Sequence, residues 1–466
     1  MVFSSITFLY YFLPIMIIVY YLTPNKRKNI TLFIGSLLFY FLGEPRFTII
    51  LLISILVDYS HSLIIVRYRG TRLAKIALIS SIVINLCLLG FFKYSDFLVS
   101  NVNSAFHSDL PLLGLTLPIG ISFFTFQTMS YTIDVYRGEA EKSESLLGLG
   151  TYVALFPQLI AGPIVRYKTV AKEIVSRQHT FENFAYGVQR FIIGLAKKVL
   201  LANTLGELSL MAKTTTDPSM LFYWIGAVTF ALQIYFDFSG YSDMAIGLGR
   251  IFGFHFLENF NYPYISRSIS EFWNRWHMSL GRWFKDYVYI PLGGNRKGKL
   301  HWFLNILIVW FLTGLWHGAS WNFILWGLFL GMFIIVEKIF FIRVLEKTPK
   351  VFSHLYVVLI IIFSFVIFNN NTLPSVAVYF KGMFGQLDIP ITSIESLYYM
   401  RSYIVLIVAA IIGATPMPVK ILNLMVRSRA NKVLNYASPI GYLALLIIVT
   451  GYIVDSSFNP FLYFRF

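Results

Sequence analysis

Long apolar runs alternate with short polar loops along most of the 466-residue chain. A helix needs about 20 predominantly apolar residues to cross a bilayer. By that measure the candidate spans are 6–22, 30–43, 47–66, 74–92, 113–133, 146–165, 183–203, 219–237, 240–256, 302–316, 318–341, 354–369, 399–413 and 439–455. Because glycine and proline interrupt several runs, we expect 30–43, 113–133 and 146–165 to be tilted or re-entrant. The pattern predicts an all-α, polytopic integral membrane protein with about 10–13 transmembrane helices in a single domain, residues 1–466.

The stretch 257–300 differs from the rest because it is too polar to span a membrane. Its bulky residues recur at steps of three and four, which marks one face of a helix; they are Trp273, Trp276, Leu280, Trp283 and Phe284. Ser270 with Glu271 is a suitable helix start, and Pro291 a suitable stop. The pattern predicts an amphipathic helix that lies at the membrane interface or dips into the protein.

Composition supports a membrane protein. Charged residues make up 13% of the chain and hydrophobic residues 57%, whereas soluble domains carry about 25% charged residues. The net charge is +16, but the basic residues sit in short loops such as Lys26–Lys28. Such loops set topology and contact anionic lipid headgroups, so nucleic acid is not an expected partner. We expect them in the cytoplasm, with the N-terminus outside. The single cysteine, Cys87, excludes a disulfide within the chain and a cysteine-rich metal site.

Two of the eight histidines stand out. His317 lies in FLTGLWHGASWNFILWG (311–327), between apolar runs. Placing an ionisable side chain at membrane depth costs free energy, so such residues usually have a function. Gly314 and Gly318 beside it permit close helix approach or leave room for a ligand. A purely structural buried histidine is an equally good interpretation of this pattern. His277 follows Trp276 in the amphipathic stretch, and its position alone favours an interfacial histidine beside aromatic anchors.

Two carboxylates, Asp237 and Asp243, lie in the nearly apolar run QIYFDFSGYSDMAIG (233–247). They are candidates to hold Arg275 or Arg282 or to polarise a histidine, although structural ion pairing is the favoured interpretation. The chain has no GxSxG elbow, no GxxxxGK[ST] loop and no HExxH pair, and we expect no metal site. A buried histidine, a basic polar segment and many helices fit proton-assisted group transfer within a membrane.

Three sequence segments resemble the motifs of a known protein family. They are DFSGYSDMAIGLGRIFGF (237–254), EFWNRWHMSLGRWFKDYVYIPLGGNR (271–296) and TGLWHGASWNFILWG (313–327). In this order they resemble the membrane-bound O-acyltransferase (MBOAT) family, and within it the bacterial branch of alginate O-acetylation. The resemblance is strongest over about 110–340, the expected acyltransferase core, with peripheral helices in 1–109 and 341–466. It implies transmembrane and re-entrant helices around a central funnel.

The resemblance also implies roles for individual residues. His317 matches the family histidine of the WHG motif, and His277 matches the second functional histidine of the bacterial branch. Positions implied to contact the donor are Asn274, Arg275, Trp276, Arg282 and Lys285. With Arg296 and Lys297, the basic residues among these are candidates to neutralise the phosphates of the donor. Membrane topology and lipid contact explain each of them equally well.

The implied reaction is O-acyl transfer, with acetyl as the expected group, from a cytoplasmic thioester to a hydroxyl outside the cell's inner (plasma) membrane. The co-substrate is acetyl-coenzyme A or another acyl thioester, with no bound cofactor. The acceptor is a polysaccharide or a separate relay protein. The alternative within the enzyme class is D-alanyl transfer from a carrier protein in teichoic acid modification. A transporter or flippase, and a non-enzymatic scaffold, remain as other classes.

Overall fold

A computed structural model of the chain describes residues 1–160, 162–427, 431–455 and 461–462, with the side chains of 431–435 excepted. Within this part the regular elements are helices, as the apolar pattern predicts, and none is a strand. The chain divides into two compact units, Met1–Phe191 with Tyr241–Glu258 and Ile192–Gly240 with Asn259–Phe466. We describe each unit by itself, and the expectation of a single domain stays a prediction.

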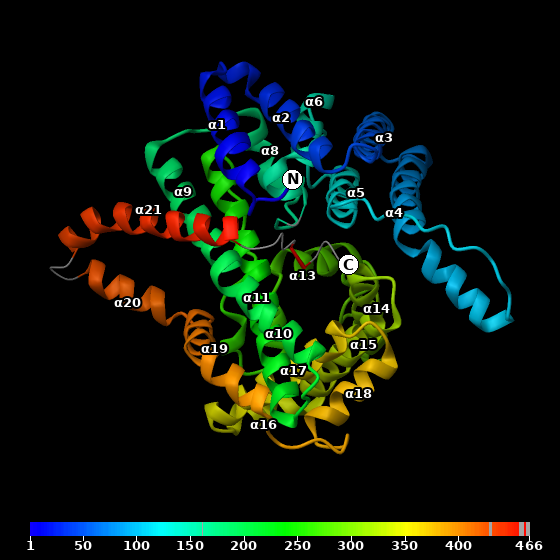
Figure 1. Ribbon diagram of the computed structural model, residues 1–466. Coiled ribbons are helices and arrows are strands. Elements are labelled where there is room, and N and C mark those ends of the chain that lie inside the picture. The colour runs from blue at the N-terminus through cyan, green and yellow to red at the C-terminus, as the bar shows by residue number, and fades with distance from the viewer. Residues whose placement is uncertain (161, 428–430, 456–460, 463–466) are drawn as a thin grey trace. The chain divides into compact units, whose positions relative to one another are not determined.

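The first unit contains the N-terminal helices. These are α1 (Leu13–Leu22), α2 (Lys28–Gly43), α3 (Thr48–Arg67), α4 (Arg72–Phe106), α5 (Ile121–Arg137), α6 (Leu146–Ala154), α7 (Phe156–Leu159), α8 (Tyr167–Val175) and the first part of α9 (Phe181–Ala196). Helix α3 packs against α4 and α5, and α2 packs against α6 (Figure 1).

A buried carboxylate joins α3, α4 and α5. Asp58 accepts hydrogen bonds from the Ser81 hydroxyl at 2.6 Å and from the Asn85 amide at 3.0 Å. The Thr128 hydroxyl of α5 donates in turn to Asn85 at 3.2 Å. Since lipid offers no hydrogen-bonding partners, polar groups at this depth must satisfy one another. The network therefore fixes the register of these three helices.

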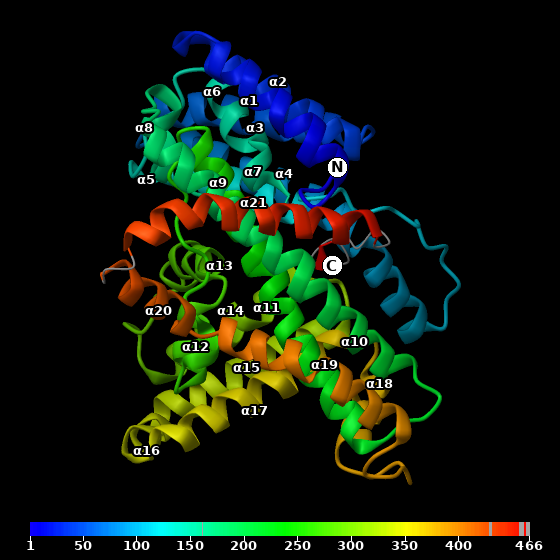
Figure 2. The same cartoon turned by 60° about the vertical axis from the view of Figure 1, so that its left-hand side comes forward.

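The second unit contains the later helices. They are α10 (Thr204–Thr214), the first part of α11 (Met220–Ile251), α12 (Ile269–Arg275), α13 (Met278–Phe284), α14 (Lys299–His317), α15 (Trp321–Val336), α16 (Ile342–Lys347), α17 (Lys350–Asn369), α18 (Leu373–Met383), α19 (Ile394–Gly413), α20 (Met417–Val426) and α21 (Asn431–Asp455). Helix α15 packs between α14 and α17, and α12 contacts both α15 and α17 (Figure 2).

Seven described helices are long and apolar enough to cross a membrane. They are Thr48–Arg67, Arg72–Phe106, Met220–Ile251, Lys299–His317, Lys350–Asn369, Ile394–Gly413 and Tyr436–Asp455. The protein is therefore a multi-pass membrane protein. The shorter apolar helices Thr7–Leu22 and Met417–Val426 add candidates, so the predicted count of spans stays a prediction.

Three predicted boundaries were wrong. Spans 219–237 and 240–256 form one helix, α11, because Gly240 continues the helix and lets it approach the backbone of Gly194 closely. The predicted span 113–133 becomes helical only at Ile121, after Gly120 adopts a positive φ of 79°. The predicted span 146–165 breaks after Ala154 into two short helices, α6 and α7. Glycine and proline positions indicated irregularity but not where a helix would resume.

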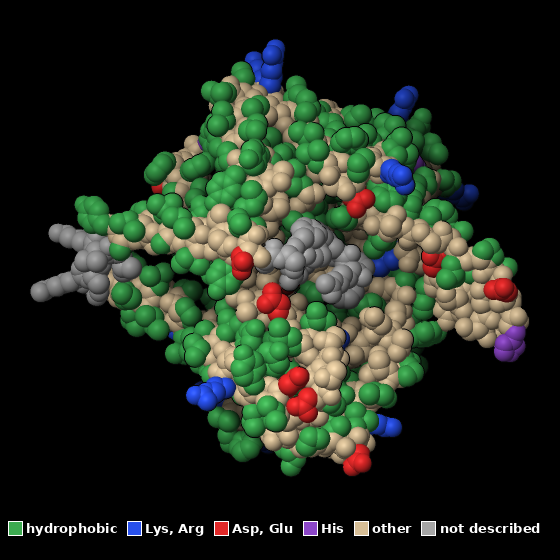
Figure 3. Space-filling view, in the orientation of Figure 1, with side chains coloured by type: hydrophobic (Ala, Val, Ile, Leu, Met, Phe, Trp, Pro, Cys, Tyr) green, Lys and Arg blue, Asp and Glu red, His purple; other side chains and the backbone are tan. Residues whose placement is uncertain are grey.

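Apolar side chains face outward on the helices of the first unit. Ile15 and Ile18 on α1 are both 59% exposed, and Ile34 on α2 is equally exposed. The space-filling view shows apolar side chains across the outer faces of these helices (Figure 3). In water such a surface would associate or aggregate. In a bilayer it is the surface that contacts lipid.

Candidate active site

The polar stretch 257–300 folds as a broken helix. Helix α12 ends at Arg275, and α13 begins at Met278. His277 lies at the break with φ 42°, a left-handed conformation that is uncommon outside glycine. One continuous amphipathic helix was therefore a wrong prediction. Trp276, Leu280 and Trp283 are buried, so the segment enters the protein, which was one of the two predicted placements.

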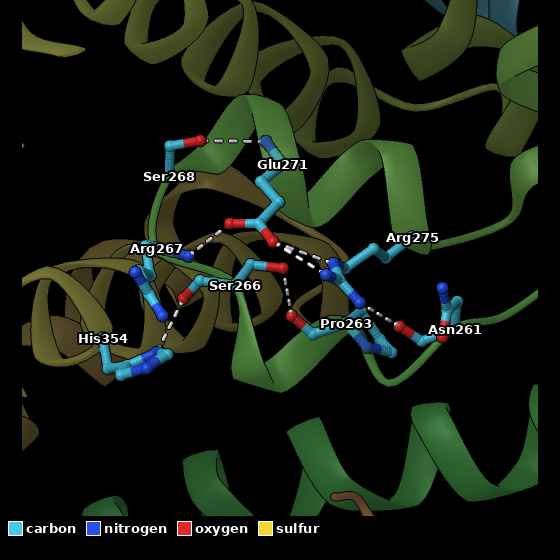
Figure 4. A network of polar contacts seen from close by, with 8 residues as sticks. All are labelled: Asn261, Pro263, Ser266, Arg267, Ser268, Glu271, Arg275 and His354. Carbon is cyan, nitrogen blue, oxygen red and sulfur yellow. Dashed lines mark hydrogen bonds and ion pairs between the residues drawn. The ribbon is translucent and has the colours of Figure 1, made fainter. Parts of the chain in front are cut away.

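Polar contacts hold α12 in place (Figure 4). The hydroxyl of Ser268 accepts a hydrogen bond from the Glu271 amide at 3.0 Å and caps the helix, which begins at Ile269, one residue before the predicted Ser270. The carboxylate of Glu271 accepts from the Arg267 amide at 2.9 Å and from Arg275 Nε at 3.0 Å. Arg275 also donates to the carbonyl oxygen of Asn261 at 3.1 Å. These bonds fix both ends of the short helix that leads to His277.

His277 is 2% exposed and is enclosed by aromatic rings. The ring of Phe238 meets the imidazole edge-on at a centroid distance of 4.6 Å. Trp316 lies 5.7 Å away on α14, centroid to centroid. Burial lowers the pKa of His277 to about 3, because the charged form would lose its hydration. The imidazole is therefore neutral at physiological pH and can exchange a proton or a hydrogen bond.

His317 is the last residue of α14 and is 4% exposed. Its ring meets Trp316, Trp326 and Phe368 edge-on, at centroid distances of 5.0, 4.9 and 5.4 Å. A side chain at Gly314, one turn earlier, would collide with the carbonyl oxygen of Phe323 on α15. Gly314 thus permits close helix approach, one of the two roles expected for it, and this approach places His317 against Trp326.

Both histidines line one cavity of about 460 Å³ within the second unit. The broken helix forms one wall, and α14 with the end of α15 forms the other. Polar residues of this lining are Ser270, Asn274, His277, Arg282, Lys285, Thr313, His317 and Lys338. Trp276 lines the cavity as well. Four of the five residues that the sequence assigned to donor binding therefore line the same cavity as both histidines; they are Asn274, Trp276, Arg282 and Lys285.

The cavity lining is basic where it is exposed and carries the two histidines where it is buried. The side chains of Arg282, Lys285 and Lys338 are exposed, whereas His277 and His317 are buried. An elongated anionic molecule could place its phosphates at the basic mouth and a neutral reactive group beside the imidazoles. Two buried imidazoles that line one cavity are suited to general acid–base chemistry.

Other predicted site residues lie elsewhere in the structure. Arg275 is held by Glu271, and Arg275, Arg296 and Lys297 are not among the residues that line this cavity. Asp237 binds Lys198 Nζ at 2.6 Å and also accepts the Leu462 amide at 2.8 Å. Asp243 binds Arg190 Nη2 at 2.6 Å. The two aspartates thus have basic partners from the helices before α11, and the favoured interpretation as structural ion pairs describes them.

Sequence reasoning missed three residues around the cavity. Lys338 lines the mouth, and its neighbour Glu337 is fully buried. The Glu337 carboxylate accepts from the Ile269 amide at 2.6 Å and from the Ser270 amide and hydroxyl, both at 2.9 Å. A charged pair inside the apolar run 318–341 was a usable signal. Asn259, which contacts His277 Nδ1 at 3.2 Å, left no comparable signal in the sequence.

Comparison with known proteins identifies relatives over most of the chain. A probable alginate O-acetylase of Pseudomonas aeruginosa is 41% identical over 390 residues, covering 83% of this chain and 75% of that protein. A peptidoglycan O-acetyltransferase of Helicobacter pylori is 35% identical over 421 residues, covering 83% and 80%. A teichoic acid D-alanyltransferase of Bacillus subtilis is 31% identical over 224 residues, covering 45% and 56%.

The family comparison agrees with the geometry of the cavity. The sequence model of the membrane-bound O-acyltransferase family matches residues 64–378, which include both histidines and every residue that lines the cavity. The matched relatives are named for O-acetyl transfer and, over a shorter segment, for D-alanyl transfer. The chain belongs to the membrane-bound O-acyltransferase (MBOAT) family and is a multi-pass membrane acyltransferase.

Proposed function

We propose that this protein transfers an acetyl group from a thioester donor to a hydroxyl group of an extracytoplasmic polysaccharide or of a relay protein. The observation that carries the proposal is the single cavity lined by both buried histidines and by exposed basic residues. The names of the two relatives that match over 83% of this chain support acetyl as the group and a cell-surface polymer as the final acceptor.

The reaction needs a base because a hydroxyl group is a weak nucleophile near neutral pH. His317 removes the hydroxyl proton as the oxygen attacks the thioester carbonyl carbon. The new C–O bond forms, the C–S bond breaks, and the proton passes from His317 to the leaving thiolate. A positioned base contributes about 10²–10⁴-fold. His277 orients the thioester and the incoming hydroxyl from the opposite wall of the cavity.

The donor is acetyl-coenzyme A or an acylated phosphopantetheine on a carrier protein. Both bear phosphates at one end and the thioester at the other. Arg282, Lys285 and Lys338 at the mouth match the phosphates in charge. The donor is a co-substrate, so no cofactor needs to stay bound between turnovers.

The two substrates come from opposite sides of the membrane. Basic loops mark the cytoplasmic side, where thioester donors are made, and the acceptor lies outside the inner (plasma) membrane. A separate extracytoplasmic protein is a suitable partner to pass the acyl group to the polymer. D-alanyl transfer from a carrier protein remains the second candidate, and the shorter match to a teichoic acid D-alanyltransferase favours it less than acetyl transfer.

The test is transfer of radiolabelled acetyl from acetyl-coenzyme A by the purified protein in nanodiscs, with the candidate partner or acceptor polymer present. We expect His317→Ala to reduce transfer at least about 100-fold, and His277→Ala to reduce it strongly. His301→Ala is the matched control, because His301 lies exposed on the same helix as His317 and does not line the cavity.

Three outcomes decide between the candidates. Transfer by wild type and His301→Ala, but not by folded His317→Ala, supports the proposal. Equal transfer by His317→Ala overturns the catalytic assignment. Transfer from a D-alanyl carrier protein, with none from acetyl-coenzyme A, replaces acetyl transfer with D-alanyl transfer.

A further inference from the structure

The segment that precedes α12 folds back along the break that carries His277. The Asn261 amide donates to the Arg275 carbonyl oxygen at 2.9 Å, and the Met278 amide donates to the Asn259 carbonyl oxygen at 2.9 Å. These two backbone bonds bracket Trp276 and His277, and Figure 4 shows Asn261 beside Arg275. They hold the left-handed backbone of His277, a conformation that costs about 1–2 kcal/mol in a residue with a side chain.

The fully buried side chain of Asn259 reaches the imidazole itself. Its Oδ1 accepts the Ser279 backbone N–H at 3.1 Å and the Ser279 hydroxyl at 2.9 Å. A backbone N–H can only donate, so the amide atom at this position is the oxygen and not the nitrogen. The same oxygen lies 3.2 Å from His277 Nδ1. The Ser279 hydroxyl oxygen lies 3.4 Å from the same Nδ1, but its hydrogen is donated to Asn259 Oδ1 over the shorter distance of 2.9 Å. Both oxygens that face Nδ1 therefore act as acceptors, and Nδ1 carries the hydrogen.

The location of this hydrogen decides what His277 can do. Since burial holds the pKa of His277 at about 3, the ring carries one proton at physiological pH. Asn259 places that proton on Nδ1, so Nε2 has a lone pair and no hydrogen. A histidine in this tautomer accepts a hydrogen bond or a proton through Nε2, and it cannot donate one to a carbonyl oxygen.

We propose that Asn259 is a positioning residue that fixes His277 as the Nδ1–H tautomer, so that Nε2 accepts a hydrogen from an N–H or O–H group of a substrate in the cavity. The role of His277 toward a substrate rests on the proposed acyl transfer, whereas its tautomer rests only on the hydrogen bonds of Asn259. It assigns His277 the part of an acceptor that orients a substrate, and it excludes His277 as the donor that stabilises a developing oxyanion.

The first test reads the tautomer without any substrate. Nitrogen-15 spectra of histidine-labelled protein in nanodiscs, compared with His277→Gln for assignment, distinguish a protonated from an unprotonated ring nitrogen. We expect a protonated Nδ1 and an unprotonated Nε2 between pH 6 and 8. We expect Asn259→Ala to convert the signal to the other tautomer or to a mixture. An Nε2–H ring in the wild type overturns the inference, whatever the protein transfers.

The second test uses a replacement of the same shape. Asn259→Asp keeps the accepting oxygen and adds a negative charge beside Nδ1, which favours the doubly protonated ring. We expect the transfer rate of Asn259→Asp to fall as pH is lowered through the raised pKa of His277. The pH–rate profile of the wild type should show no such decrease. We expect Asn259→Ala to lower kcat about 10- to 100-fold, with a smaller change in KM.

The matched control is Asn305→Ala. Asn305 is also buried and donates to the backbone carbonyl oxygen of Gly294 at 2.9 Å, and it neither contacts His277 nor lines the cavity. Its loss tests general destabilisation, so its pH profile should follow that of the wild type. If Asn259→Asp and Asn305→Ala both keep the wild-type profile and the wild-type ring signals, Asn259 is only a structural residue and the inference is wrong.

Discussion

Two neighbouring residues of the second unit, Glu337 and Lys338, have different roles beside the cavity. The Glu337 carboxylate accepts four hydrogen bonds, from Ile269 and Ser270 at the start of α12 and from the Tyr356 hydroxyl at 3.3 Å. Lys338 instead lines the exposed mouth of the cavity. One residue thus anchors the broken helix that carries His277, and the next supplies charge where the donor would enter.

Glu337→Gln should destabilise the protein by about 2–4 kcal/mol. A glutamine places an NH₂ group where one carboxylate oxygen accepts a backbone N–H, which leaves a buried donor without an acceptor. Unfolding midpoints in detergent, followed by tryptophan fluorescence, measure the effect. Glu346→Gln is the control because Glu346 is exposed on α16. Equal midpoints for the two variants would show that Glu337 does not anchor α12.

Lys338→Met should raise KM for the acyl thioester about 3- to 10-fold and leave kcat nearly unchanged. An exposed charge contributes roughly 1 kcal/mol to phosphate binding, and it acts on ground state and transition state alike. Initial rates against donor concentration, at low and high salt, measure both constants. Lys347→Met, at the exposed end of α16 and away from the cavity lining, serves as the control. A lowered kcat with unchanged KM would argue against a binding role.

At the scale of elements, the close contact between α14 and α15 depends on two glycines, which have no side chain. A Cβ atom at Gly314 would collide with the Phe323 carbonyl oxygen, and one at Gly327 would collide with the Trp310 carbonyl oxygen. Small residues let membrane helices approach closely enough for strong van der Waals packing. Because His317 ends α14, the spacing of these two helices also sets the position of its imidazole.

Gly314→Ala should lower stability by about 1–3 kcal/mol, because the added methyl group must push α15 away. It should also reduce acyl transfer, since His317 lies one turn further along the same helix. Gly90→Ala is the matched control, because a Cβ atom at Gly90 in α4 meets nothing within 4 Å. Stability and transfer measured on the same nanodisc samples would distinguish the two. Retained wild-type activity in Gly314→Ala would mean that His317 does not depend on this contact.

At the scale of the whole molecule, each unit holds a histidine whose charged form is disfavoured. Burial lowers the pKa of His277 in the second unit to about 3. In the first unit, burial and then the nearby cations Lys28 and Arg177 lower the pKa of His179 to about 4. His179 Nε2 lies 2.8 Å from the hydroxyl oxygen of Tyr20, which itself donates to the Phe252 carbonyl oxygen. Both histidines are thus neutral in the folded protein well below their ordinary pKa.

Acid should therefore destabilise the folded state. An unfolded histidine binds a proton below pH about 6.5, whereas folded His179 binds one only near pH 4. Between these values the unfolded state holds more protons, so the free energy of unfolding falls as pH is lowered. His179→Gln should flatten this dependence between pH 6.5 and 4. Unfolding midpoints across that range measure the slope, and an unchanged slope would contradict the lowered pKa of His179.

The sequence by itself determined the class of the protein and singled out most of the polar residues that line its candidate site. Apolar runs of bilayer length imply helices, since no other local structure satisfies the backbone in lipid. His277 and His317 were found because they stand beside motifs that resemble the family. Arg282 and Lys285 were found as cations near the same motif, and both line the cavity with the histidines.

Only the tertiary structure decided where the helices break and which polar groups meet. Periodicity over 270–290 cannot distinguish one helix from two, because the break at His277 is held by Asn259 and Glu337, from separate parts of the chain. Helix propensity is local, whereas the contacts that join Glu337 to the start of α12 and Asn259 to His277 link residues far apart in the sequence. The tautomer that we propose for His277 likewise depends on an oxygen that the fold brings to Nδ1.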